Sequence, residues 1–307
     1  MPRVVRFEQF GGPEVLQVVE AERPAPGEGT VLVRVRAAGL NPVESGIRGG
    51  FLDQVYPTSF PSQQGRDVAG VVEAAGPGVT AFAPGDEVIG WTDERGTQAD
   101  YAVVPAANLT ARPDGVPWEV AGALYTAGAA AWAAIRAVAA GEGDTVVVAN
   151  AAGGVGSIAV QLARIAGATV IGLAGEDHHE WLRGRGVVPV AYGEGVEERV
   201  RAAAGDKVDA FVDAFGAGYV DLALRLGVQP DRVNTLIDFA AVAQHGVKAS
   251  GSNDASSPEV LAELAGLVAG GRLEVPVRAF PLERVAEAYA ELERRHTLGK
   301  LVVTPAA

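Results

Sequence analysis

The residues best suited to chemistry form a glycine-rich turn between a predicted strand and a predicted helix. The turn matches the dinucleotide-binding fingerprint, except that Ala151 replaces its first glycine. Gly153 would let the backbone approach a pyrophosphate, and Gly156 would let the helix pack tightly on the sheet. The helix N-terminus offers unpaired N–H groups and a positive dipole end to phosphates. The alternative is a tight turn without a ligand. We predict that the turn binds a dinucleotide through Ala152, Gly153, Gly154, Val155 and Gly156.

The end of the next predicted strand indicates which dinucleotide would bind. NAD sites usually carry an acid there, about 20 residues after the fingerprint, to hold the ribose diol. This chain has Gly172-Leu173-Ala174-Gly175 at that point and no acid. Glu176 and Asp177 come slightly later, where we expect the next helix. Gly175 leaves room for a 2′-phosphate, and His178 or Arg183 would supply the positive charge. The alternative for these two cations is a solvated helix face. We therefore predict NADPH as the cofactor.

Changes in residue composition and spacing along the chain indicate the strands and helices around this turn. Up to residue 117, short apolar runs are separated by Gly and Pro, which is typical of a small antiparallel barrel or sandwich. An alanine-rich helix, interrupted at Gly128, then precedes strands that alternate with helical segments, which indicates a parallel sheet. We predict strands at 31–36, 67–76, 86–90, 145–149, 169–173, 187–190, 210–213, 232–237, 275–280 and 299–303, and helices at 118–140, 157–166 and 282–294.

The composition excludes several classes of protein and site. The chain has no cysteine, which excludes disulfides, thiol catalysis and thiolate metal sites. Its formal net charge of -13 repels phosphate backbones and argues against nucleic-acid binding. No apolar run reaches the ~18 residues that a membrane span needs. The first six residues lack an apolar core with a cleavage site. We therefore expect no membrane association and a cytoplasmic location.

Several segments in a fixed order resemble one family of oxidoreductases. They are residues 37–44, 65–72, 84–88, 151–156 and 299–303, within a similarity that runs from about Arg3 to Pro305. On these motifs, the chain resembles the zinc-independent quinone oxidoreductase branch of the medium-chain dehydrogenase/reductases. The resemblance implies an α/β fold, a cofactor cleft between two domains and a homodimer. The implied domains are a GroES-like β-rich catalytic domain (1–117), a Rossmann domain with a doubly wound parallel sheet (118–268) and a return segment completing the catalytic domain (269–307).

The resemblance also bears on metal binding. Zinc-dependent relatives place a cysteine ligand where this chain has Asn41, and a His-Glu pair where it has Arg66-Asp67. The four-cysteine structural lobe of those relatives is also missing. The histidines at positions 178, 179, 245 and 296 have no spacing suited to a shared site. We therefore predict that the chain holds no metal.

Asn41 and Tyr56 are the predicted catalytic residues. The family's matching Asn lies near the nicotinamide ribose and the substrate, so Asn41 would donate to either, unless it only starts the turn before Pro42. Tyr56 would donate a phenolic proton or stack on a flat substrate, with ordinary packing as the alternative. Glu44 and Asp67 are carboxylates near the expected cleft, but ion pairs with Arg48 or Arg66 are the simpler account. We identify no general acid, and the final proton would come from solvent.

Further cofactor contacts are predicted at four positions. Thr126 lies in the segment where the family contacts the nicotinamide end, although the threonine of relatives is replaced by Ala130. Tyr192 matches a family tyrosine near the adenosine phosphate. Phe215 follows a predicted strand and should line the cofactor cleft, as strand ends do in such sheets. Ile237 occupies the corresponding place one strand later.

These residues favour an NADPH-dependent enzyme that transfers hydride to a quinone or an α,β-unsaturated carbonyl. Such substrates spread the developing charge themselves, so the protein only has to orient the reactants, exclude water and donate a hydrogen bond. One alternative is an enoyl-thioester reductase of fatty-acid or polyketide metabolism. The other is a non-catalytic NADPH-binding sensor. Turnover of NADPH with quinones or enones would separate these three hypotheses.

Overall fold

The computed structural model describes residues 1–205 and 207–306. The chain forms two compact units. Unit 1 consists of Met1–Thr126, Ser257–Gly271 and Pro276–Ala307, and unit 2 consists of Ala127–Ser256 and Arg272–Val275. Helix α8 (Pro258–Ala269) packs against strands β6 and β8 of unit 1. These limits therefore differ from the predicted boundaries at 117–118 and 268–269, which assign this helix to the Rossmann domain.

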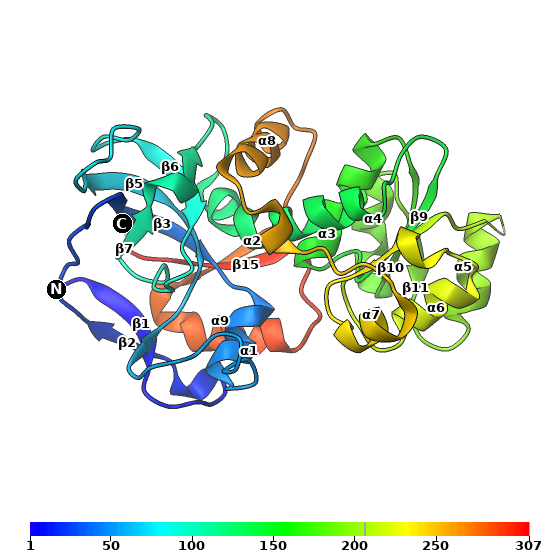
Figure 1. The fold of residues 1–307 in the computed structure, drawn as a ribbon, viewed down its shortest axis with the longest axis horizontal. Helices are drawn as coiled ribbons and strands as arrows, with labels where there is room; N and C mark the ends of the chain where they lie inside the picture. The colour runs from blue at the N-terminus through cyan, green and yellow to red at the C-terminus, as the bar shows by residue number, and fades with distance from the viewer. Residues whose placement is uncertain (206, 307) are drawn as a thin grey trace. The chain divides into compact units, whose positions relative to one another are not determined.

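Unit 1 is built on two antiparallel-rich sheets (Figure 1). The larger sheet has the order β14-β15-β3-β5-β6-β8, with β7 also paired to β3. Strand β15 comes from the C-terminal segment and pairs antiparallel with β3 through Val302 and Gly39, so the return segment completes this sheet. The strands are β1 (Arg3–Phe7), β2 (Gln17–Glu20), β3 (Thr30–Gly39), β4 (Ser62–Gln63), β5 (Asp67–Ala75), β6 (Glu87–Trp91), β7 (Tyr101–Pro105), β8 (Leu109–Ala111), β14 (Val277–Pro281) and β15 (Lys300–Thr304).

Two short helices bring polar side chains to the core of unit 1. Helix α1 (Pro42–Arg48) follows β3 directly, and α9 (Val285–Glu293) precedes β15 and contacts it. The core between them contains Leu40, Tyr289 and Leu301, all fully buried. The ends of β3, α9 and β15 therefore meet although they are far apart in the chain. Single 3₁₀ turns lie at Pro13–Val15, Ala106–Asn108 and Leu282–Arg284.

Unit 2 is a parallel sheet with helices along its strands (Figure 1). The strand order is β11-β10-β9-β12-β13, so the direction of winding reverses between β9 and β12. Valine-rich β9 lies in the middle, where burial on both faces favours continuous apolar runs. The elements are β9 (Thr145–Ala149), α3 (Gly154–Ile165), β10 (Thr169–Ala174), α4 (His179–Gly184), β11 (Val188–Ala191), α5 (Val196–Ala204), β12 (Ala210–Asp213), α6 (Tyr219–Arg225), β13 (Val233–Thr235) and α7 (Phe239–His245), with 3₁₀ turns at Glu176–His178, Pro230–Arg232 and Ser252–Ala255.

One edge of the parallel sheet is covered by the chain itself. The backbone N–H of Thr235 donates to the carbonyl of Lys248 at 2.9 Å, and the N–H of Lys248 donates to the carbonyl of Val233 at 2.9 Å. The buried side chain of Asn234 adds two hydrogen bonds to the backbone of Ser250. The segment after α7 thus forms hydrogen bonds with backbone groups of β13 that would otherwise be free to pair with another strand.

The predicted strands and the α/β class are confirmed, while two helix predictions need correction. Helix α2 (Trp118–Ala137) is continuous through Gly128, so the predicted interruption is wrong; a single glycine costs a helix only about 1 kcal/mol relative to alanine. Helix α3 begins at Gly154, before the predicted start at Ser157, because the glycine turn itself forms the first helical turn. No helix within the described residues is long and apolar enough to cross a membrane.

Candidate active site and dinucleotide site

The glycine turn of unit 2 has a backbone that only very small residues fit. A Cβ added to Gly156 would lie 1.9 Å from the carbonyl oxygen of Asn150, and one added to Gly153 would lie 2.6 Å from the Asn150 side chain. Gly153 is the N-cap of α3, and no side chain caps the helix there. The first N–H groups of a helix have no partner within it. Because α3 lacks a side-chain cap, these groups remain available to an anion.

Three polar side chains tie together the strand ends around this turn. Asn150 Nδ2 donates to the carbonyl of Ala214 at 3.3 Å, which links the ends of β9 and β12. Asp213 Oδ1 accepts from the N–H groups of Phe215 and Gly216 at 2.9 and 2.8 Å. Asp213 Oδ2 accepts from Thr235 Oγ1 at 2.8 Å, which links β12 to β13. Ligands of doubly wound sheets bind at the point where strand order reverses, and β9 and β12 form that point here.

The end of β10 carries the features that sequence reasoning associated with a 2′-phosphate. A Cβ on Gly175 would lie 3.2 Å from the hydroxyl oxygen of Tyr192, so these two predicted residues are neighbours. Arg199 donates to the carbonyls of Ala191 and Glu194 at 2.8 and 2.7 Å, and thereby fixes the loop that holds Tyr192. Sequence reasoning missed Arg199, because its contacts are to backbone atoms.

The other predicted cofactor residues of unit 2, except Arg183 on α4, follow the ends of successive strands. His178 ends a 3₁₀ turn directly after Gly175, and Arg183 is exposed on α4. The ring of Phe215 stacks on that of Tyr192 with centroids 6.5 Å apart and an angle of 17° between planes. Ile237 follows β13 and is 49% exposed. The structure thus groups Tyr192 and Phe215 and places Ile237 near Gly216, whose added Cβ would lie 3.0 Å from Ile237.

Unit 1 contains a buried network of charged and polar side chains around Asn41. Asn41 is 2% exposed, and its backbone N–H donates to Glu44 Oε2 at 2.9 Å. Its amide nitrogen lies 3.4 Å from Glu44 Oε1. Lys300 donates to Asn41 Oδ1 and, at 2.7 Å, to the carbonyl of Leu40. Asn41 therefore does more than begin a turn before Pro42, since both ends of its amide contact charged groups.

Tyr289 and Gln98 complete the surroundings of Glu44. Tyr289 is fully buried and donates its phenolic proton to Glu44 Oε2 at 2.5 Å. Gln98 Nε2 donates to the Tyr289 oxygen at 2.8 Å, and the N–H of Arg66 donates to Glu44 Oε1 at 3.0 Å. Burial raises the pKa of Glu44, and the nearby Asp67 carboxylate raises it further; the Tyr289 hydrogen bond acts in the opposite direction. Sequence reasoning missed Tyr289, Gln98 and Lys300, because their partners lie far away along the chain.

Asp67 is the second buried carboxylate of this network. Its Oδ1 accepts from the hydroxyl of Thr126 and, at 3.3 Å, from the Thr126 N–H. Its Oδ2 lies 4.0 Å from the Lys300 ammonium. Thr126 is therefore bound to a carboxylate of unit 1. Its predicted contact with a cofactor stays a prediction.

The predicted ion pairs of these carboxylates are wrong. Arg48 pairs with Glu293, and its Nε donates to the carbonyls of Gly11 and Gly12 instead of reaching Glu44. Arg66 pairs with Asp93. Arg48 and Glu44 are four residues apart, a spacing that allows pairing on a helix. The buried network holds Glu44 away from Arg48.

Comparison with known proteins identifies the family. Residues 27–114 match the model for the alcohol dehydrogenase GroES-like domain, and residues 189–303 match the zinc-binding dehydrogenase model. The chain is 31% identical over 329 residues to quinone oxidoreductase from Pseudomonas aeruginosa, a match that covers 99% of this chain and 100% of that protein. The chain belongs to the quinone oxidoreductase branch of the medium-chain dehydrogenase/reductases.

Two further members of the family illustrate the range of the similarity. Quinone oxidoreductase from Rattus norvegicus is 37% identical over 180 residues, which cover 57% of this chain and 53% of that relative, so the match spans about half its length. The structure of Escherichia coli quinone oxidoreductase complexed with NADPH is 26% identical. It covers 99% of this chain and 100% of its own, with a TM-score of 0.87. This likeness confirms the GroES-like and Rossmann folds of the two units.

The zinc-binding dehydrogenase model raises the question of metal ligands. Across residues 1–205 and 207–306, no group of three or more His, Cys, Asp or Glu side chains is placed to hold a metal ion. In this chain, Asn41 and Asp67 instead lie around the ammonium of Lys300. Zinc independence stays a prediction based on the missing thiolates.

Tyr56, the second predicted catalytic residue, lies in the loop after α1. Its side chain is half-buried, and its N–H donates to the carbonyl of Leu52 at 2.8 Å. Phe51 and Val55 in the same loop are 87% and 68% exposed. The structure therefore places Tyr56 in a loop that exposes two apolar side chains. Its catalytic role stays a prediction.

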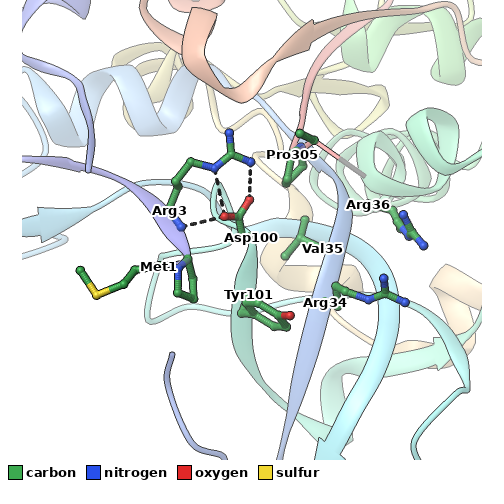
Figure 2. Close-up of a pocket in the computed structure, with 10 residues that line it drawn as sticks. Met1, Arg3, Arg34, Val35, Arg36, Asp100, Tyr101 and Pro305 are labelled. Carbon is green, nitrogen blue, oxygen red and sulfur yellow. Dashed lines mark hydrogen bonds and ion pairs between the residues drawn. The ribbon is translucent and has the colours of Figure 1, made fainter. Parts of the chain in front are cut away.

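A pocket of about 420 Å³ lies elsewhere in unit 1, beside the C-terminal segment. Figure 2 shows Arg3 and Asp100 at its centre, where Arg3 donates to Asp100 Oδ2 from Nε at 3.0 Å and to Oδ1 from Nη2 at 2.7 Å. Arg34 and Tyr101 also line it. None of the predicted site residues does so, and the Arg3–Asp100 pair connects β1 to the segment before β7. We interpret these contacts as structural.

Proposed function

We propose that this chain is an NADPH-dependent reductase that transfers hydride to a quinone or an α,β-unsaturated carbonyl. The observation that carries the proposal is the end of β10, where Gly175 lies beside the Tyr192 hydroxyl and the strand itself ends without an acid. Glu176 and Asp177 come only in the 3₁₀ turn that follows. A carboxylate at this place would favour the ribose diol of NADH, and its absence leaves room for a phosphate. The names of the relatives and the NADPH complex of the Escherichia coli protein support the same reading.

The residues of unit 2 fit a dinucleotide in three respects. The uncapped N-terminus of α3 offers N–H groups to a diphosphate. Gly153 and Gly156 lie so close to Asn150 that a Cβ would not fit, so the turn has no side chain at these two positions. Tyr192 would donate to the 2′-phosphate, with His178 or Arg183 as the cation. We propose that Phe215 and Ile237 line the remainder of the site in unit 2, and that Thr126 of unit 1 contacts the nicotinamide end.

On unit 1, we propose that Asn41 donates a hydrogen bond from its amide nitrogen to the carbonyl oxygen of the substrate or to the nicotinamide ribose. Bound NADPH would supply the hydride. Quinones and enones delocalise the charge that develops on reduction, so one positioned donor in a dry site suits this chemistry. Tyr56 would contribute a flat apolar surface and a hydroxyl. Glu44 and Asp67 are engaged by Tyr289 and Thr126, so we propose solvent as the source of the final proton.

A cofactor titration followed by turnover tests the proposal. NADPH and NADH binding is measured by fluorescence, and NADPH consumption is then followed with 1,4-quinones, linear enones and enoyl thioesters. We expect tighter NADPH binding and turnover of quinones or enones. Tighter NADH binding would contradict the cofactor assignment. Binding without turnover would favour a sensor, and faster turnover of thioesters would favour an enoyl-thioester reductase. Arg183→Ala and His178→Ala identify the cation, with the surface variant Arg225→Ala as the control.

A further inference from the structure

The closing motif of the chain brings a lysine ammonium against the amide of Asn41. Lys300 is the first residue of β15 and is 4% exposed. Its ammonium donates to the carbonyl of Leu40 at 2.7 Å and to Asn41 Oδ1. Asn41 follows the end of β3 by two residues and Lys300 begins β15, and the pairing of these two strands brings the residues together. The ammonium thus approaches Asn41 from the oxygen side of the carboxamide.

The two charged neighbours of Asn41 select the same orientation of its amide. An ammonium has three donors and no acceptor, so it can only face Oδ1. A carboxylate only accepts, and Glu44 Oε1 lies 3.4 Å from Nδ2. Rotating the amide by half a turn would place two donors together at Lys300 and two acceptors together at Glu44. One of the two hydrogens on Asn41 Nδ2 is directed toward Glu44. Because the carboxamide cannot rotate, the second hydrogen also points in a fixed direction.

The surroundings of Lys300 act on its pKa in opposite directions, and the net effect is a lowered pKa. Burial lowers its pKa, while the Asp67 and Glu44 carboxylates counteract that lowering. Asp67 Oδ2 is 4.0 Å from the ammonium and accepts no hydrogen bond in the part of the chain that the structure describes. A neutral residue of the same length would therefore remove a positive charge from beside two buried carboxylates and leave Asn41 Oδ1 without the ammonium donor.

We propose that Lys300 is a positioning residue: its buried ammonium fixes the carboxamide of Asn41 so that the amide N–H points in one direction for the reaction. The proposal rests on the proposed function, because it assumes that Asn41 donates to the substrate or the nicotinamide ribose. It gives the closing Gly299-Lys300-Leu301-Val302-Val303 segment a role in the reaction besides completing the sheet.

The experiment compares Lys300→Met, Asn41→Ala and the double variant in NADPH-dependent turnover of a 1,4-quinone. Displacing a positioned group by about 1 Å can reduce a rate about 100-fold. We expect Lys300→Met to lower kcat about 10- to 100-fold with a smaller change in KM. In the Asn41→Ala background, the same substitution should have almost no effect on kcat. Effects that multiply in the double variant would overturn the proposal. Lys207→Met is the matched control, because Lys207 is 76% exposed and pairs with Asp209 at the surface.

A second measurement separates this proposal from the proposed function. The side-chain amide signals of Asn41 are assigned by NMR through their loss in Asn41→Ala. They should shift in Lys300→Met and stay in place in Lys207→Met. Unshifted signals would overturn the positioning role even if the enzyme turns over quinones. Shifted signals with no turnover of any quinone or enone would instead contradict the proposed function. If Lys300→Met does not fold, Lys300→Arg keeps the positive charge while moving the donors, and the same shift is expected.

Discussion

Replacing Tyr289 with phenylalanine removes one oxygen from the buried network of unit 1 and should destabilise the protein in a pH-dependent way. Tyr289 is fully buried and donates to Glu44 Oε2 at 2.5 Å. A hydrogen bond to a charged group contributes about 1.5–3 kcal/mol, so we expect a loss of about 2 kcal/mol in the free energy of unfolding at pH 8. Gln98 loses one acceptor but keeps the carbonyl of Gly39 at 3.2 Å, so it adds little to the loss.

The pH dependence follows from the pKa of Glu44. Burial raises this pKa in the folded protein above its ordinary value of 4.5. The folded state therefore binds the proton more tightly than the unfolded state, and stability falls as the pH rises from about 4.5 through the folded pKa. The Tyr289 hydrogen bond opposes this rise in pKa, because it stabilises the carboxylate. Without it the folded pKa rises further, so Tyr289→Phe should cost more at pH 8 than at pH 5.

Urea unfolding at the two pH values measures the effect. We expect the variant to lose about 2 kcal/mol at pH 8 and a smaller amount at pH 5, because a lower pH favours the protonated carboxyl. Tyr101→Phe is the matched control, since the Tyr101 ring lies under Arg23 and keeps that contact without its hydroxyl. An equal loss at both pH values, or no loss at pH 8, would refute the assigned contact between Tyr289 and an ionised Glu44.

Three other substitutions test the dinucleotide unit. Gly156→Ala should lower stability by about 1–3 kcal/mol and weaken NADPH binding measured by fluorescence, because its Cβ would meet the Asn150 carbonyl at 1.9 Å. Gly175→Asp should weaken NADPH binding relative to NADH about tenfold or more in the same titration, since a carboxylate repels a phosphate. Thr235→Val should cost about 1–3 kcal/mol in urea unfolding, because Asp213 Oδ2 loses its donor at 2.8 Å. Unchanged affinities or midpoints would contradict each of these assignments.

Local patterns in the sequence were enough to predict much of the fold. The valine run at 145–149 indicated a buried parallel strand, and it lies in the middle of the sheet. The small residues of the turn at 151–156 indicated a strand-to-helix connection, because only such residues allow the close approach seen between Gly156 and Asn150. Both signals lie within a few residues, so they need no knowledge of distant contacts. The continuity of α2 through Gly128 was missed, because one glycine does not decide whether a helix ends.

The site around Asn41 could be predicted only in part. Asn41 stood out through the resemblance, but its partner Lys300 is 259 residues away. The contact between Tyr289 and Glu44 spans 245 residues. Pairing Glu44 with Arg48 was the local expectation, and the structure instead directs Arg48 to Glu293. Such contacts depend on how β15 and α9 return to β3, which the periodicity of each segment does not specify.

The covered edge of β13 limits how this protein can associate with itself. The N–H of Thr235 and the carbonyl of Val233 are already bonded to Lys248, so they are not available to a strand from a second chain. Exposed edge strands are the usual sites of unwanted aggregation, and a covering segment removes that hazard. The homodimer implied by the resemblance stays a prediction. If it forms, its subunits cannot continue the sheet by direct pairing of β13, and the contact must use a different surface.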